Sequence, residues 1–137
     1  MFARKLSVFS GMQENLIKDA KTIAVFDDDQ DLLDIFRFLL EEVGHKVVLF
    51  NNCDDIVSKV RDVNPVLILM DNWIPLIGGE QAIGQIRNEE DLKHIPVILV
   101  SASNDIAEVA KRAGADGVIA KPFDFDVILS MINKLIG

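Results

Sequence analysis

The sequence predicts a doubly wound α/β domain whose five strands form one parallel sheet. Two observations predict this fold class. Of five short apolar runs, most lack the polar alternation of half-exposed strands, and this continuous apolar character is typical of parallel strands covered on both faces. Amphipathic stretches separate these runs, so strands and helices alternate along the chain from residue 22 onward. We therefore expect one domain over residues 22–137, preceded by an N-terminal extension over residues 1–21.

The predicted strands are the five apolar runs. They are rich in Val and Ile, residues that fit well into a pleated and buried surface. Their length of four to six residues suits strands better than helices. The runs span residues 22–27, 46–50, 66–71, 96–101 and 117–120.

The predicted helices lie between these runs and after the last one. Each shows an apolar stripe at helical spacing. Gly44 follows the first stripe, Asn64-Pro65 the second and Gly114 the fourth, and all are residues that end helices. The five stripes are Leu32, Phe36, Leu39, Leu40 and Val43; Ile56, Val57, Val60 and Val63; Ala82, Ile83 and Ile86; Val109, Ala110 and Ala113; and Ile128, Met131, Ile132 and Leu135.

Residues 1–21 differ from the rest of the chain. Four basic and two acidic residues give this segment a charge of +2. Because the net charge of the whole chain is −8, residues 22–137 carry a charge of −10. Two interpretations stay open: an added helix or partner-binding segment, or a poorly ordered extension with Met12 as the true start. The apolar residues, at roughly helical spacing interrupted by Ser10-Gly11, are Phe2, Leu6, Phe9, Met12, Leu16 and Ala20; the charged ones are Arg4, Lys5, Glu14, Lys18, Asp19 and Lys21.

The composition excludes several classes of function. Half of the 137 residues are hydrophobic, so we expect a packed core. The net charge of −8 argues against nucleic-acid binding, which needs clustered Lys and Arg. A single cysteine, Cys53, excludes an internal disulfide and a multi-cysteine zinc site. No apolar stretch approaches the ~20 residues of a membrane helix, and no signal-peptide core begins the chain, so we expect a cytoplasmic protein without membrane contact.

Three aspartates are predicted to meet at one edge of the sheet. Ligands of doubly wound sheets bind beyond the carboxyl ends of the strands, where the strand order reverses. The flavodoxin-like order 2-1-3-4-5 sets the first and third strands side by side, so that Asp27, Asp28 and Asp71 share one crevice. Their mutual repulsion calls for a divalent cation such as Mg²⁺. Ser101 and Lys121, after the fourth and fifth strands, complete a set suited to phosphoryl transfer.

A calcium site is a rival interpretation of the acidic cluster. Asp27-x-Asp29-x-Asp31 matches the start of an EF-hand loop. That loop needs Gly at its sixth position and Glu at its twelfth. Here these positions hold Leu32 and Phe38, which belong to a predicted helix, so the calcium interpretation fails.

Two further alternatives explain the acids less well. An aspartate-dependent phosphohydrolase of the haloacid dehalogenase type would use Asp27 as nucleophile and Asp29 as acid. Such enzymes usually carry Thr or Val where this chain has Asp31, and a cap or longer body. Helix N-capping explains one or two of the acids after the first strand, but not Asp71 at the end of another strand. No Gly-rich phosphate loop follows the first strand, so nucleotide binding has no support.

An ordered set of segments resembles the receiver domain of two-component response regulators. The resemblance covers residues 22–136, nearly everything except the N-terminal extension. No single segment is specific, whereas the ordered set at these spacings is highly so. The segments are Ile23-Ala24-Val25-Phe26-Asp27-Asp28-Asp29, Leu67-Ile68-Leu69-Met70-Asp71, Pro75 with Gly79, Pro96-Val97-Ile98-Leu99-Val100-Ser101-Ala102, Gly114-Ala115-Asp116-Gly117 and Lys121-Pro122-Phe123.

The resemblance implies roles for the acidic residues. Asp71 matches the phospho-acceptor, which takes a phosphoryl group from a histidine kinase, a phosphotransfer protein or a small phosphodonor. Asp28 is implied as a direct Mg²⁺ ligand and Asp27 as a ligand directly or through water, together with Asp71. Trp73, two residues further on, would offer the metal only its backbone carbonyl.

The resemblance also implies roles for three residues at the ends of the last two strands. Ser101 matches the hydroxyl residue that bonds the phosphoryl oxygens and moves on activation. Lys121 matches the invariant lysine, and Lys121-Pro122 is expected to be a cis peptide. Val118 departs from the family, which usually has Tyr or Phe there, so the usual aromatic switch is missing.

The function expected from the resemblance is a phosphorylation switch. Phosphorylation of Asp71 changes partner binding, and autodephosphorylation resets the domain, so we expect no enzyme with an external substrate. The expected partners are a histidine kinase or phosphotransfer protein and a downstream protein target, with a phosphorylation-dependent homodimer as a further option. The main alternative is an interaction module that keeps the fold but works without phosphorylation.

Overall fold

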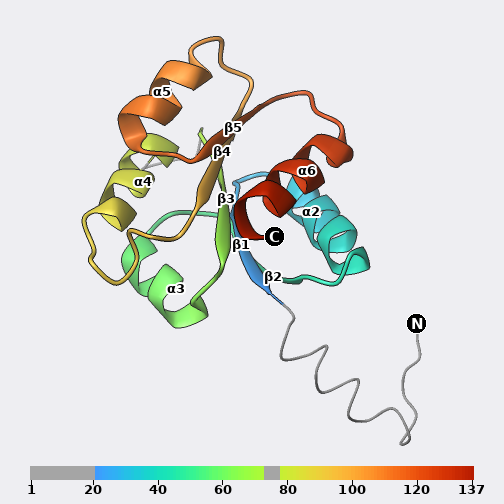
Figure 1. Ribbon diagram of the computed structural model, residues 1–137, viewed down its shortest axis with the longest axis horizontal. Helices are drawn as coiled ribbons and strands as arrows, with labels where there is room; N and C mark the ends of the chain where they lie inside the picture. Colours follow the sequence, from blue (N-terminus) through green and yellow to red (C-terminus); the bar gives the residue numbers. More distant parts are fainter. Residues whose placement is uncertain (1–20, 73–77) are drawn as a thin grey trace, which may run out of the picture.

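The computed structural model describes residues 21–72 and 78–137. Five parallel strands form one sheet in the order β2-β1-β3-β4-β5, as the sequence predicts. Figure 1 shows α2 and α6 on one face of this sheet and α3, α4 and α5 on the other. In chain order the elements are β1 (Thr22–Phe26), α2 (Gln30–Glu42), β2 (Lys46–Phe50), α3 (Ile56–Val63), β3 (Leu67–Asp71), α4 (Gly79–Arg87), β4 (Val97–Ser101), α5 (Ile106–Ala113), β5 (Gly117–Ala120) and α6 (Phe125–Ile136).

The strand boundaries agree with the prediction to within one residue. Asp27, Val66 and Pro96 lie just outside β1, β3 and β4. All three still form a backbone hydrogen bond with a neighbouring strand. The Asp27 N–H donates to the Phe50 carbonyl at 3.0 Å, the Val66 N–H donates to the Thr22 carbonyl at 2.9 Å, and the Pro96 carbonyl accepts from the Ile68 N–H at 3.0 Å. Pro96 has no N–H to donate to a ladder, so β4 begins after it.

Three helices end just before the residues that the sequence predicts to stop them. Gly44, Asn64 and Gly114 all have positive φ, at 95°, 52° and 88°, and follow α2, α3 and α5. This left-handed conformation suits Gly and is tolerated by Asn, and it ends a helix. At the other end of α2, the Asp29 carboxylate accepts hydrogen bonds from the backbone N–H groups of residues 31 and 32 and so caps the helix.

The apolar side chains form two layers, one on each face of the sheet. One layer packs α2 and α6 against the sheet, and the other packs α3, α4 and α5 against the opposite face. Strands β3 and β4 are buried at every residue. Their continuous apolar runs are therefore explained by cover on both faces.

This arrangement places the carboxyl ends of β1, β3, β4 and β5 along one edge of the sheet. At the opposite edge the chain enters β1 at Lys21, whose carbonyl accepts from the Lys46 N–H at 2.9 Å. The prediction for residues 1–20 lies outside the described residues. Within the described ranges, no helix combines the length and the apolar character that crossing a membrane requires.

Candidate functional site

The carboxylates of Asp27, Asp28 and Asp71 come together at the edge of the sheet. β1 and β3 are neighbours with Phe26 opposite Met70, so the residues that follow them emerge side by side. One oxygen from each of the three carboxylates lies within 4.8 Å of the others. The predicted meeting of these three aspartates is confirmed.

The three carboxylates differ in burial. Asp27 and Asp71 are 3% and 4% exposed, whereas Asp28 is open to solvent. Two buried carboxylates at close range are costly because little water screens their repulsion. A cation at this position would relieve this repulsion, and the exposed Asp28 leaves the pocket open on one side.

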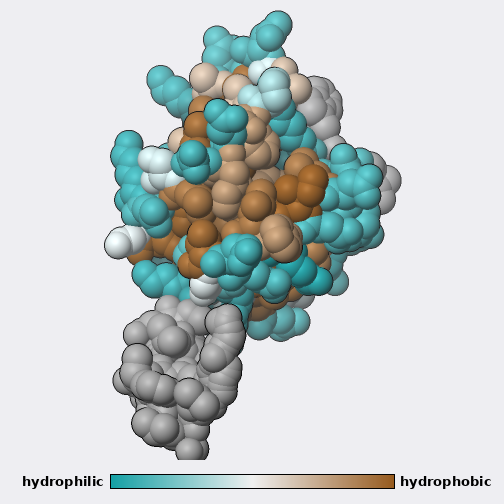
Figure 2. All heavy atoms as spheres, turned by 90° about the vertical axis from the view of Figure 1, so that its right-hand side faces the viewer, coloured by the Kyte–Doolittle hydropathy of each residue, from teal (hydrophilic) through white to brown (hydrophobic). Residues whose placement is uncertain are grey.

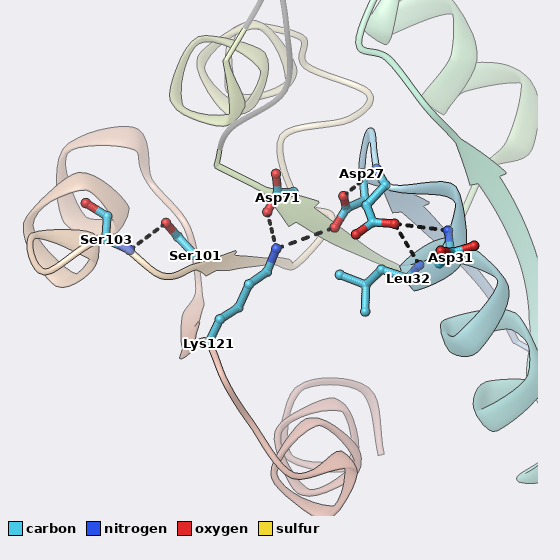
Figure 3. Close-up of polar contacts among 8 residues, drawn as sticks. Asp27, Asp31, Leu32, Asp71, Ser101, Ser103 and Lys121 are labelled. Carbon is cyan, nitrogen blue, oxygen red and sulfur yellow. Dashed lines mark hydrogen bonds and ion pairs between the residues drawn. The ribbon is translucent and has the colours of Figure 1, made fainter.

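Lys121 supplies one positive charge to this pocket. It follows β5, and its Nζ donates to Asp71 Oδ1 at 2.8 Å and lies 3.8 Å from Asp27 Oδ2 (Figure 3). Burial alone would lower the pKa of Lys121, but the hydrogen bond to Asp71 and the charges of Asp71 and Asp27 outweigh burial, and the pKa is raised. Lys121 is therefore charged at neutral pH. The Lys121-Pro122 peptide is cis, as the resemblance implies.

Asp27 holds its proton more strongly than an ordinary aspartate. Burial raises its pKa from 3.8 to about 6, and the Asp71 charge adds to this effect. The Asp29 N–H, which donates to Asp27 Oδ1 at 2.9 Å, and the Lys121 charge act in the opposite direction. Burial of the carboxylate is thus the larger effect in the metal-free pocket.

Ser101 forms the side of the pocket at the end of β4. It is fully buried, and its Oγ accepts a hydrogen bond from the Ser103 N–H at 3.0 Å (Figure 3). The Lys121 N–H donates to the Ser101 carbonyl at 2.9 Å, so β4 and β5 hold the hydroxyl and the ammonium in fixed relation. The Ser103 hydroxyl in turn donates to the Asp105 carboxylate.

The structure thus brings together five of the six predicted site residues. Trp73 is the sixth, and it lies outside the described residues. Sequence reasoning gave no role to Gly79, yet a Cβ at this position would lie only 2.6 Å from the Asp71 carbonyl oxygen. Only glycine allows such a close approach of two backbone segments. The signal in the sequence was a glycine placed eight residues after the predicted acceptor Asp71.

The donor set fits a hard divalent cation. The candidate ligands among the described residues are all carboxylate oxygens, which Mg²⁺ prefers, and the charge of Lys121 balances only one of the three acids. A nucleophilic carboxylate beside a cation site, a lysine and a buried hydroxyl is an arrangement that can accept a phosphoryl group.

Comparisons with known proteins agree with this arrangement. Residues 23–133 match the response regulator receiver domain family. The CAI-1 autoinducer sensor kinase/phosphatase CqsS of Vibrio cholerae is 34% identical over 82% of this chain, which spans only 17% of that kinase. The polar-differentiation response regulator DivK of Brucella anthropi is 27% identical over 85% of this chain and 97% of its own length.

A solved structure with the same fold contains a metal ion. The receiver domain of the sensor histidine kinase PA1611 from Pseudomonas aeruginosa aligns with a TM-score of 0.79 and 25% identity. The alignment covers 86% of this chain and 98% of that domain. That structure contains a magnesium ion coordinated in its active-site cleft.

Proposed function

Because this chain belongs to the response regulator receiver domain family, we propose that Asp71 accepts a phosphoryl group in a Mg²⁺-dependent reaction and that this modification changes protein binding. One observation carries the proposal: three carboxylates at the ends of two neighbouring strands have oxygens within 4.8 Å of one another, and a lysine donates a hydrogen bond to Asp71, the buried candidate nucleophile. A purely structural cluster of acids has no need of this convergence.

The proposed chemistry is a single displacement at phosphorus. An Asp71 carboxylate oxygen forms the new O–P bond while the bond to the donor breaks, and the electron pair leaves with the donor's histidine nitrogen or acetate oxygen. The product is an acyl phosphate on Asp71. A Mg²⁺ ion held by Asp27, Asp28 and Asp71, with the Trp73 carbonyl as a further proposed ligand, would neutralise charge on the phosphoryl oxygens.

Lys121 and Ser101 then stabilise the product. Lys121 Nζ already lies 2.8 Å from Asp71 Oδ1, within reach of a phosphoryl oxygen attached there. The Ser101 oxygen accepts from Ser103, so its own O–H is the donor that it can direct at the phosphoryl group. A change in the position of Ser101 is therefore the first structural consequence that we expect.

The proposal includes the partners and the location that the sequence predicts. A histidine kinase or phosphotransfer protein donates the phosphoryl group in the cytoplasm, a protein target reads the modified domain, and the domain removes its own phosphoryl group without an external substrate. Val118 lies on β5, half-buried against the layer of α3, α4 and α5, and the proposed switch has no aromatic side chain at this place.

The test is the intact mass after incubation with acetyl phosphate. We expect one added phosphoryl group on the wild-type chain with Mg²⁺, and none with EDTA or in Asp71→Asn. Asp62→Asn, an exposed aspartate on α3, is the matched control and should gain the same group as wild type. An unmodified wild-type chain would support the phosphorylation-independent module, and turnover of an external phosphoester would support the hydrolase.

A further inference from the structure

An apolar groove runs between α2 and the start of α6. It has a volume of about 630 Å³, and its apolar lining includes Leu32, Ile35 and Leu39 of α2 with Phe123 and Phe125 from the opposite wall. Figure 2 shows the same face, where apolar side chains form a broad patch framed by hydrophilic ones. Lys121 also lines the groove, and because its Nζ bonds Asp71, the groove borders the acidic pocket.

The groove continues into exposed apolar side chains along α2. Ile35, Phe38 and Val43, the last at the C-cap, are 51%, 64% and 49% exposed. In the described ranges, only Val127 on α6 joins them as a large hydrophobic side chain with comparable exposure. An apolar face of this extent is typical of a surface that another segment covers.

The N-terminal segment joins the described chain beside the end of α6. Lys21 Nζ donates to the Ile136 carbonyl at the end of α6 at 2.9 Å, and the Lys21 carbonyl accepts from the N–H of Lys46, the first residue of β2, at 2.9 Å. From Glu42 back to Leu32 is ten residues of helix, about 15 Å, and twenty helical residues span about 30 Å. Residues 1–20 are therefore long enough to run the length of the groove.

The chemistry of this segment complements the groove. Phe2, Leu6, Phe9 and Leu16 recur at helical spacing and supply an apolar stripe. Residues 1–20 carry three basic and two acidic residues, a charge of +1, whereas α2 carries four acidic residues and one arginine, a charge of −3, and both Lys121 and Asp124 line the groove. Apolar contact and opposite charge thus favour the same docking surface.

We propose that residues 1–20 dock through their apolar side chains into the α2–α6 groove of their own chain. The tether sets an effective concentration in the millimolar range, so the segment outcompetes a second copy at micromolar protein concentration.

The test places a nitroxide on the segment and measures where it broadens amide signals. Ser7→Cys provides the labelling site, because Cys53 is buried and burial raises the pKa of its thiol to about 12. Wild type treated with the same reagent checks that Cys53 stays unlabelled. We expect amides of Leu32–Leu39 and Phe123–Phe125 to lose at least half of their intensity, while amides of α3, α4 and α5 keep theirs.

Two matched variants test the surface itself. Ile35→Ser removes an exposed groove residue and should restore the lost intensities, whereas Val127→Ser, with similar exposure but outside the groove lining, should leave them low. Phe9→Ser tests the segment and should act like Ile35→Ser. All of these changes are at exposed or terminal positions, so the fold is expected to persist.

Three results would overturn the proposal. The first is the absence of localised broadening in the labelled chain. The second is broadening that survives Ile35→Ser. The third is broadening of an unlabelled, isotope-enriched chain mixed with labelled chains, since this would identify a second copy as the occupant. No phosphorylation is involved, so the outcome is independent of the proposed function.

Discussion

The protonation of one carboxylate, Asp27, links the pocket to the stability of the whole fold. Its pKa of about 6 means that the folded protein binds a proton in a pH range where the unfolded chain, with a pKa of 3.8 at this residue, does not. Proton binding in this range favours the folded state. The contribution is fully present below about pH 4 and is lost as the pH rises through about 6.

Asp27→Asn should remove this pH dependence in the metal-free protein. A pKa shift from 3.8 to about 6 corresponds to at most about 3 kcal/mol of unfolding free energy. As the pH rises from 4.5 to 7.5, the unfolding free energy of the variant should therefore increase by roughly 2–3 kcal/mol relative to that of wild type. Urea unfolding of both proteins in EDTA at several pH values measures the difference. A difference that is constant with pH would show that Asp27 is charged in the folded protein throughout.

At the scale of elements, the position of α4 depends on a close approach between two segments of backbone. Gly79 begins α4, and its N–H donates to the Asn72 carbonyl at 3.1 Å. A Cβ on Gly79 would meet both the Asp71 carbonyl oxygen and, at 3.0 Å, the Asn72 Cα. Backbone cannot yield as a flexible side chain does, so α4 sits where only glycine allows it.

Gly79→Ala should therefore destabilise the protein, by about 1–3 kcal/mol, because the added methyl group forces α4 away from β3. Gly84→Ala is the matched control in the same helix: its Cβ would meet no atom within 4 Å. The control should gain about 0.5–1 kcal/mol from the higher helix propensity of alanine. Urea unfolding compares the two, and equal midpoints would contradict the close approach.

The elements that could be predicted from the sequence are those whose signals are local. The continuous apolar run of β3 and the stop at Gly44 needed only neighbouring residues to be interpreted. Contacts between distant segments could not be predicted in this way. Arg87 is an example: its guanidinium donates to the carbonyls of Gly114, Lys93 and Ile95, which come together only after α4 and α5 have packed.

The candidate site was predictable for a related reason. A topological rule places the strand ends together, so Asp27 and Asp71 could be paired from sequence alone. The groove could not be, because it depends on how α2 packs beside Phe123 and Phe125, far along the chain. Helix amphipathicity indicated a buried stripe on α2, but not that Ile35 and Phe38 would remain exposed.

For the whole molecule, the acidic pocket lowers the free energy of unfolding in the absence of a bound cation. Three acids against one lysine leave unbalanced charge at the sheet edge, on a chain whose net charge is −8. A ligand that binds only the folded state returns this stability in proportion to its occupancy. A divalent cation should therefore act on the unfolding of the entire domain.

Magnesium should raise the melting temperature of wild type relative to EDTA at equal ionic strength. At ten times its dissociation constant a ligand adds about 1.4 kcal/mol. Asp28→Asn, at an exposed carboxylate of the cluster, should keep the fold but lose most of this increase. Asp62→Asn on the surface of α3 should keep it in full, and thermal unfolding of the three proteins with and without Mg²⁺ decides the matter. An equal increase in all three would indicate non-specific screening.

The bond between Lys121 and Asp71 joins two strands that are not neighbours, since β4 lies between β3 and β5. Lys121 also lines the groove, so one side chain belongs to two binding surfaces. Whatever moves this ammonium at the pocket alters the wall of the groove. Such coupling is reciprocal: an occupant of the groove must change the affinity of the pocket by the same factor as a pocket ligand changes the affinity of the groove. Under the two proposals made above, the affinity of each site is therefore to be measured with the occupancy of the other site specified.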